Sequence, residues 1–233
     1  MTQFTRPGVA GARVEAPAPL TPSPTLARVA GALALGHVVL LFAGFSQGVS
    51  VEHGDSPATV QRVYGGANLT RVFTGGYVEA LSFVVLAAAV VLIARLFGRR
   101  TEAGHVAAQT FLALGVALVA STLAVGFPPG AAALYGSQHG ADIGSVAMVN
   151  DIRNFGFVLQ VALMAAMSLA LGIAALAEQL CTRWVGVFGI VLGGVGIVLV
   201  PLAHNVVSLV WILWWVGLAV LLLRGRRTAR QIS

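Results

Sequence analysis

Six runs of mostly apolar residues follow one another along the chain. They cover residues 29–47, 72–96, 106–127, 155–177, 184–202 and 206–223. Each run can cross roughly 30 Å of hydrocarbon at about 1.5 Å per residue of helix. The runs lack the alternation of a barrel strand, and backbone amides in lipid need partners within their own segment. We therefore predict an all-α, polytopic bundle of about six transmembrane helices.

Arginine placement predicts which ends of these helices face the cytoplasm. The outer segments would hold only Arg62, Arg71 and Arg153. The cytoplasmic segments would hold Arg6, Arg13, Arg28, Arg95, Arg99, Arg100, Arg183, Arg224, Arg226, Arg227 and Arg230. This asymmetry follows the positive-inside rule, and basic residues at both ends of the last apolar stretch require a hairpin near residues 201–205. We predict an N-in/C-in protein of the bacterial inner (plasma) membrane.

The segments outside the apolar runs predict a simple domain organisation. Residues 1–24 are proline-rich without periodicity, which is typical of a flexible cytoplasmic tail, and residues 225–233 form a basic cytoplasmic tail. Residues 25–224 form one six-helix transmembrane domain. The first run is longer than the apolar region of a typical signal peptide and lacks a clear cleavage site, so we interpret it as an uncleaved span.

Two outer loops carry local structure signals. In residues 55–70, Ser56 and Pro57 form a helix start, Val60 and Tyr64 share a helical face, and glycines follow. A short surface helix is expected there. The second loop, residues 128–150, opens with Pro-Pro-Gly and is interpreted as a cap over the outer end of the bundle.

Composition excludes several classes of protein. Hydrophobic residues make up 58% of the chain and charged residues 9%, far from the usage of soluble domains. The net charge is +6, and the arginines that produce it lie beside the apolar runs rather than on one patch. This placement argues against nucleic-acid binding. The single Cys181 excludes an internal disulfide. We expect no cofactor and no metal, because the outer candidates are scattered without a recognised ligand spacing: Glu52, His53, Asp55, His139 and Asp142.

Polar groups at membrane depth are the main functional candidates, because a charge inside a span is costly unless it is paired or hydrated. The candidates near the outer leaflet are Glu79, Arg71, Asp151, Arg153, His204 and Asn205. They could converge on one polar pocket, with Glu79 paired to Arg153 or Arg71, or they could only fix helix register. His37 lies midway along the first span, as a neutral core histidine or as part of a proton relay with Glu79. A bis-histidine haem is not expected, since His105 and His204 are predicted at opposite edges.

Two further patterns in the sequence bear on function. Residues 44–48 fit the G-x-S-x-G pattern around Ser46, with His204 and Asp151 expected on the same side, but the pattern depends on a strand-to-helix elbow and no strand is predicted. Gly189 and Gly193 have the small-x-x-x-small spacing of close helix packing, either within the bundle or at a subunit interface.

At the level of its spans, the chain resembles a family of small bacterial six-helix membrane proteins catalogued only as a domain of unknown function. The resemblance lies in residues 71–100, with Glu79 in Gly-Gly-Tyr-Val-Glu-Ala-Leu, and in Trp184-Val-Gly-Val-Phe-Gly-Ile. It covers most of residues 25–227. It implies the architecture and no established activity.

The sequence leaves three hypotheses for function. The first is a non-enzymatic bundle that binds or passes a small molecule or lipid through the outer polar pocket around Glu79. The second is a structural or partner subunit, docked on another membrane protein or on a second copy through its glycine-rich fifth span. The third is an intramembrane serine hydrolase that uses Ser46.

Overall fold

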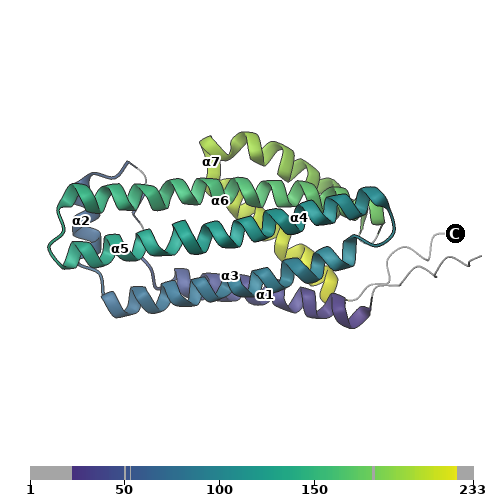
Figure 1. Cartoon of the computed structure of the whole chain (residues 1–233), viewed down its shortest axis with the longest axis horizontal. Helices are drawn as coiled ribbons and strands as arrows, with labels where there is room; N and C mark the ends of the chain where they lie inside the picture. The colour runs from purple at the N-terminus through teal and green to yellow at the C-terminus, as the bar shows by residue number, and fades with distance from the viewer. Residues whose placement is uncertain (1–22, 50, 53, 180–181, 225–233) are drawn as a thin grey trace, which may run out of the picture.

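The computed structural model describes residues 23–49, 51–52, 54–179 and 182–224, and every regular element among them is a helix (Figure 1). The elements in chain order are α1 (Pro24–Phe45), α2 (Pro57–Gly65), α3 (Leu69–Phe97), α4 (Glu102–Ser121), the π-helical segment η1 (Thr122–Gly126), α5 (Phe127–Gln138), α6 (Ile143–Glu178) and α7 (Arg183–Arg224). The predictions for the tails, His53 and Cys181 fall on residues outside the described ranges, apart from Ser23 and Pro24.

Five stretches of the described chain are long and apolar enough to cross a membrane. They are Pro24–Phe45, Leu69–Phe97, Glu102–Gln138, Ile143–Glu178 and Arg183–Arg224. Their outward faces stay apolar, since Leu202 is 85% exposed and Val198 is 73% exposed. Exposed apolar surface on this scale suits contact with lipid rather than with water. The predicted all-helical class is confirmed, and the number of crossings depends on how α7 is divided.

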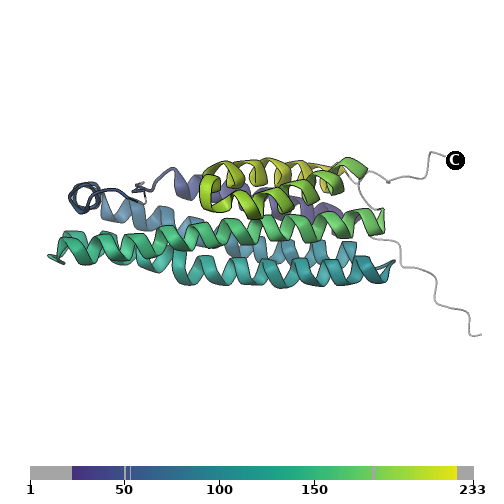
Figure 2. The same ribbon diagram turned by 90° about the horizontal axis from the view of Figure 1, so that it is seen from above.

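Helix α7 folds back on itself at Ala203. The backbone there leaves the helical region (φ −146°, ψ 38°), two residues after Pro201, whose missing N–H removes one helical hydrogen bond. The indole Nε1 of Trp214 donates to the carbonyl oxygen of Val185 at 3.2 Å, although 29 residues separate the two. A straight helix would hold them about 43 Å apart. The two halves of α7 are therefore antiparallel neighbours, as Figures 1 and 2 show, in the hairpin predicted from Arg183 and Arg224.

The third and fourth predicted spans are longer than expected. The helix that includes residues 106–127 continues through η1 into α5, and α6 begins at Ile143 rather than near residue 155. Pro128 and Pro129 stand in the first turn of α5, where the missing N–H groups cost little. Asp142 starts α6 by accepting hydrogen bonds from the N–H groups of Gly144 and Ser145 at 2.8 and 3.2 Å. The predicted outer cap is thus built from helices.

The start of α1, the α3–α4 turn, the end of α6 and the end of α7 lie at one end of the bundle, which we call the arginine-rich end (Figure 1). Glu178, the last residue of α6, is only 1% exposed. Its carboxylate accepts hydrogen bonds from the N–H groups of Arg100 and Thr101 and from the Thr101 hydroxyl, at 2.9–3.2 Å. Glu178 therefore fastens α6 to the α3–α4 turn.

The opposite end, which we call the cap end, is formed by α2, α5 and the start of α6. Helix α2 runs across the long axis of the bundle (Figures 1 and 2). Ser56 accepts the Thr59 N–H and Gly66 ends the helix, so the predicted surface helix is confirmed. Buried Val60 and Tyr64 pack with Leu134 and Val146 in a small core separate from the main one. Because α6 has 36 residues, it is about 54 Å long and extends well beyond roughly 30 Å of hydrocarbon.

Candidate functional site: a polar cluster at the cap end

Close backbone contact between α1 and α3 positions Glu79. A Cβ added to Gly44 would lie 2.6 Å from both the Glu79 nitrogen and the Gly75 carbonyl oxygen. A Cβ added to Gly75 would lie 2.7 Å from the Gly44 oxygen. Only glycine fits at either position, because real Cβ atoms need more room. The half-buried Glu79 side chain therefore leaves α3 from a backbone that is fixed against α1.

The π-helical segment η1 faces the polar residue Gln160 of α6. A Cβ added to Gly126 would lie 3.2 Å from Gln160 Nε2, and Gly156 packs directly on Val125. Gln160 is buried, and among the described residues its Nε2 has no hydrogen-bond partner. A buried amide donor without a partner is costly, and π-helical turns occur often at functional sites. This turn is the irregular part of an otherwise α-helical span.

The charges of the site come from α3 and α6. Glu79 has Arg153 as its electrostatic partner. The Arg153 side chain lies against Gly130 of α5, where an added Cβ would lie 3.0 Å from its Cδ. Its guanidinium group donates to the Tyr64 hydroxyl at 3.4 Å. The sequence predicted Glu79 paired with Arg153 or Arg71, and Arg153 is close enough to act on Glu79 electrostatically, although no ion pair within 4 Å joins these two described residues.

Tyr64 and Asn150 link these charges to α2. The Tyr64 hydroxyl donates to Asn150 Oδ1 at 2.7 Å. Asn150 is fully buried, and its Nδ2 has no partner among the described residues. Two glutamines hold α2 against α5: Gln61 donates to the Ser137 carbonyl oxygen at 2.8 Å, and Gln138 donates to the Tyr64 and Ala67 carbonyl oxygens at 2.9 and 2.8 Å. We call Glu79, Arg153, Tyr64, Asn150 and Gln160 the cap-end polar cluster.

His37 of α1 lies beside Ser82 of α3, which is about one helical turn farther along α3 than Glu79. Its Nδ1 bonds the Ser82 carbonyl oxygen at 3.0 Å, its ring meets Phe83 edge-on at 5.3 Å, and among described residues Nε2 has no partner. The Ser82 hydroxyl donates to the Glu79 backbone oxygen at 2.6 Å. Hydrogen bonds thus join His37 to the backbone of α3.

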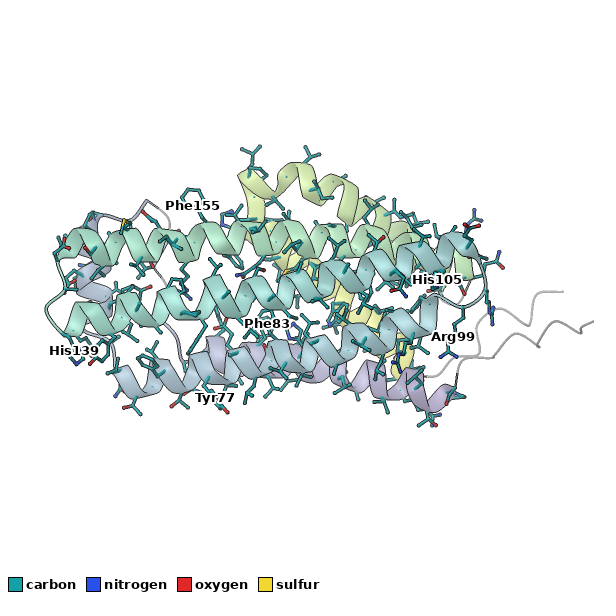
Figure 3. All side chains as sticks on the ribbon, viewed as in Figure 1. Tyr77, Phe83, Arg99, His105, His139 and Phe155 are labelled. Carbon is teal, nitrogen blue, oxygen red and sulfur yellow. The ribbon has the colours of Figure 1, made fainter. Side chains whose placement is uncertain are left out.

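The remaining predicted site residues lie around this cluster. Arg71 is exposed in the first turn of α3, and Asp151 is half-buried on α6. His204 and Asn205 lie at the turn of α7, where the His204 ring packs edge-on against Phe157 at 5.7 Å and the Asn205 carbonyl oxygen accepts the Ser208 hydroxyl. Figure 3 shows Tyr77 and Phe155 of the same region pointing away from the bundle.

Ser46 and the fifth-span glycines have local or intramolecular contacts. The Ser46 hydroxyl donates to the Ala43 carbonyl oxygen at 2.9 Å at the end of α1. Cβ atoms added to Gly189 or Gly193 would meet Ser168, Leu169 and Ala165 of α6. The small-x-x-x-small face therefore packs inside the bundle. No group of three or more His, Cys, Asp or Glu residues that could hold a metal occurs in the part of the chain that the structure describes.

Sequence reasoning missed Tyr64 and Asn150 as site residues, because their bond joins positions 86 residues apart. No family model, curated protein or solved structure matches this chain. The resemblance to the six-helix family therefore stays a prediction, and the function has to be argued from the geometry.

Proposed function

We propose that the chain is a bundle of six membrane crossings, N-in/C-in, that binds or passes a small polar molecule or lipid headgroup at the cap-end polar cluster. The first half of α7, Arg183 to Leu202, provides 20 residues of helix, enough for roughly 30 Å. The observation that carries the binding proposal is that two buried amides on the same helix as Arg153, Asn150 Nδ2 and Gln160 Nε2, have no hydrogen-bond partner among the described residues. An acceptor oxygen of a ligand would satisfy either amide donor, and the two donors lie ten residues apart on α6, about 15 Å along the helix axis.

The test compares Glu79→Gln with Glu102→Gln. Glu102 is an exposed carboxyl group in the first turn of α4, so its variant removes the same charge at the other end of the bundle. Purified full-length protein in detergent is screened by thermal shift against amino acids, sugars, sugar phosphates and glycerophosphodiesters. We expect a compound that stabilises the wild type and Glu102→Gln but not Glu79→Gln. Equal stabilisation of all three, or no shift from any compound in the panel, contradicts the proposal.

A structural subunit is the alternative from a different class. Gly189 and Gly193 are already packed on α6, so a partner helix would have to use another face of α7, such as the one with Gly194, which has open space around it. Cross-linking from a photoreactive residue at Val191 or Val195, both exposed, tests this alternative. A specific cross-linked partner together with an inert Glu79→Gln variant would favour the subunit over the binding protein.

The serine hydrolase hypothesis needs a base near Ser46. Among the described residues, the hydrogen bond that Ser46 makes is to the Ala43 backbone, and the His204 ring packs on Phe157. Labelling by a fluorophosphonate probe that is abolished by Ser46→Ala is the result this hypothesis requires.

A further inference from the structure

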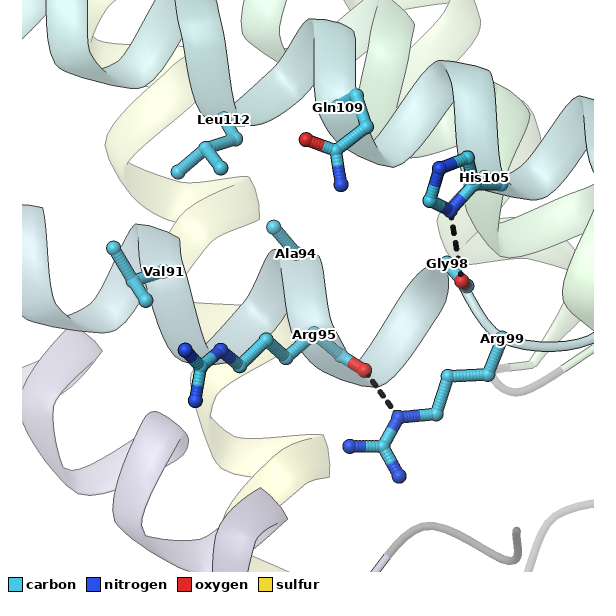
Figure 4. Close-up of a pocket in the computed structure, with 8 residues that line it drawn as sticks. All are labelled: Val91, Ala94, Arg95, Gly98, Arg99, His105, Gln109 and Leu112. Atoms are coloured by element: carbon cyan, nitrogen blue, oxygen red, sulfur yellow. Dashed lines mark hydrogen bonds between the residues drawn. The ribbon is translucent and has the colours of Figure 1, made fainter.

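A groove between α3 and α4 opens near the arginine-rich end. Its volume is about 340 Å³, and it is lined by Val91, Ala94, Arg95, Gly98, Arg99, His105, Gln109 and Leu112. Figure 4 shows Val91, Ala94 and Arg95 of α3 on one side, His105, Gln109 and Leu112 of α4 on the other, and Gly98 and Arg99 in the turn that joins the two helices. None of these residues belongs to the cap-end polar cluster, so the groove is independent of the proposed binding site, and only its place on the cytoplasmic side rests on the proposed N-in/C-in topology.

The lining changes from apolar to cationic along the helix axis. Val91 and Arg95 are four residues apart on α3, which is about 6 Å of helix, and Arg99 follows in the turn after Phe97, the last residue of α3. On α4, Leu112 lies across the groove from Val91, and Gln109 and His105 follow toward the start of the helix (Figure 4). A phospholipid has the same order, with acyl chains toward the bilayer centre and a phosphate at its edge.

Two arginines line this groove, and its lining holds no acidic residue. Arg99 Nε donates to the Arg95 carbonyl oxygen at 2.6 Å, which leaves the terminal nitrogens of Arg99 available. For the Arg95 guanidinium, no hydrogen bond or ion pair is found among the described residues, and both arginines are exposed. The nearby carboxylate of Glu178 is already bound to the α3–α4 turn. Among the residues that the structure describes, no carboxylate lines the groove to neutralise this positive charge.

We propose that this groove binds an anionic phospholipid of the cytoplasmic leaflet. Arg95 and Arg99 would hold the phosphate, the Gln109 amide would bond the headgroup, and Val91 and Leu112 would contact the start of an acyl chain. Basic pockets between transmembrane helices on the cytoplasmic side have the charge and position that such headgroups need.

The test is native mass spectrometry of the purified full chain, titrated with phosphatidylglycerol or phosphatidylcholine of the same acyl chains. The proposal expects preferential binding of phosphatidylglycerol by the wild type. The double variant Arg95→Gln/Arg99→Gln should bind it about 30-fold more weakly, because each arginine near the surface contributes on the order of 1 kcal/mol and 1.4 kcal/mol is tenfold.

The matched control is Arg28→Gln/Arg183→Gln. It removes two exposed charges from the same end, on α1 and α7, which do not line the groove, and it should bind phosphatidylglycerol like the wild type. Equal loss in both double variants, or equal binding of the two lipids by the wild type, overturns the proposal.

A second variant separates a lipid from a free anion and does not depend on the arginines. Val91→Trp, at an exposed position, fills the apolar part of the groove and leaves both charges in place. It should weaken phosphatidylglycerol binding, and inorganic phosphate should not displace the lipid from the wild type. If phosphate displaces the lipid and Val91→Trp binds phosphatidylglycerol normally, the groove takes a soluble anion and the lipid assignment is wrong.

Discussion

Replacing Glu178 with alanine should destabilise the bundle more than any change to an exposed charge. Glu178 joins the end of α6 to the α3–α4 turn, which lies 77–79 residues earlier in the chain. The side chain is buried, and Gly104 must be glycine for it to fit, because an added Cβ would lie 2.7 Å from Glu178 Cγ. The alanine variant removes the acceptor and leaves several donors of the turn unpaired.

The magnitude follows from the hydrogen bonds that are lost. The N–H groups of Arg100 and Thr101 lie 2.9 Å from the carboxylate, and the Arg99 N–H lies at 3.4 Å. A hydrogen bond to a charged group contributes about 1.5–3 kcal/mol, so the two short bonds alone amount to about 3–6 kcal/mol. Water reaches this turn in the variant, since Arg100 and Thr101 are exposed, and it replaces part of what is lost. We expect a loss of about 3 kcal/mol in the free energy of unfolding.

The assay is reversible unfolding of the purified protein by titration of a denaturing detergent into mild micelles. Glu178→Gln keeps one acceptor oxygen and should fall between the wild type and Glu178→Ala. Glu102→Gln, in the first turn of α4, should lose less than about 1 kcal/mol, the usual size of a helix-dipole effect. If Glu178→Ala loses no more stability than Glu102→Gln, the bond between α6 and the turn does not hold the bundle together.

Two further predictions concern the helix contacts that position the cap-end polar cluster. Gly44→Val should lower the free energy of unfolding by about 1–3 kcal/mol or more, because the new side chain overpacks against Glu79. The control Gly194→Val should change the free energy of unfolding little, because a Cβ at Gly194 has nothing within 4 Å. Similar losses in both variants would refute the close α1–α3 contact. Hydrogen bonds from Ser145 hold the pKa of the Asp142 carboxyl group below its usual range. The contribution of Asp142 to stability is therefore complete above the unfolded-state pKa, and it is lost as the pH falls through the folded-state pKa. Asp142→Ala should therefore be less stable than the wild type at neutral pH, and thermal unfolding should show the difference narrowing below about pH 4; a constant difference would contradict this.

The elements that the sequence predicted well are those with local signals. Ser56 and Pro57 start α2 and Gly66 ends it, all within one short segment. The turn in α7 was predicted from Pro201 and from the arginines on both sides of one apolar stretch. Such signals need no knowledge of distant contacts, because a missing N–H or a charge in lipid acts on its own segment.

The helix ends that the sequence predicted poorly are those where a neighbouring helix continues without a break. Pro128 and Pro129 were interpreted as the end of a span, but η1 changes the helical register just before them and α5 continues in nearly the same direction (Figure 1). A π-helical turn leaves no clear signal in the pattern of apolar residues. Residues 143–154 are mixed in polarity because that part of α6 packs on the cap rather than in lipid.

The residues of the candidate site were only partly predictable, for a related reason. Glu79 and Arg153 stand out because charges are rare in the apolar runs. Tyr64, Asn150 and Glu178 lie in segments where polar residues are common, and their importance comes from hydrogen bonds to distant parts of the chain. Burial of these three side chains is a property of the tertiary packing.

The central claim is that α7 crosses the membrane twice, with both termini on the arginine-rich side. The most direct measurement is labelling of single cysteines in whole cells, after replacement of Cys181, by a maleimide that cannot cross the membrane. The account predicts labelling at positions 140 and 205 from outside, and labelling at positions 100 and 233 only after the membrane is made permeable. Protection of position 205 from outside, with labelling from the side of position 233, would contradict six crossings.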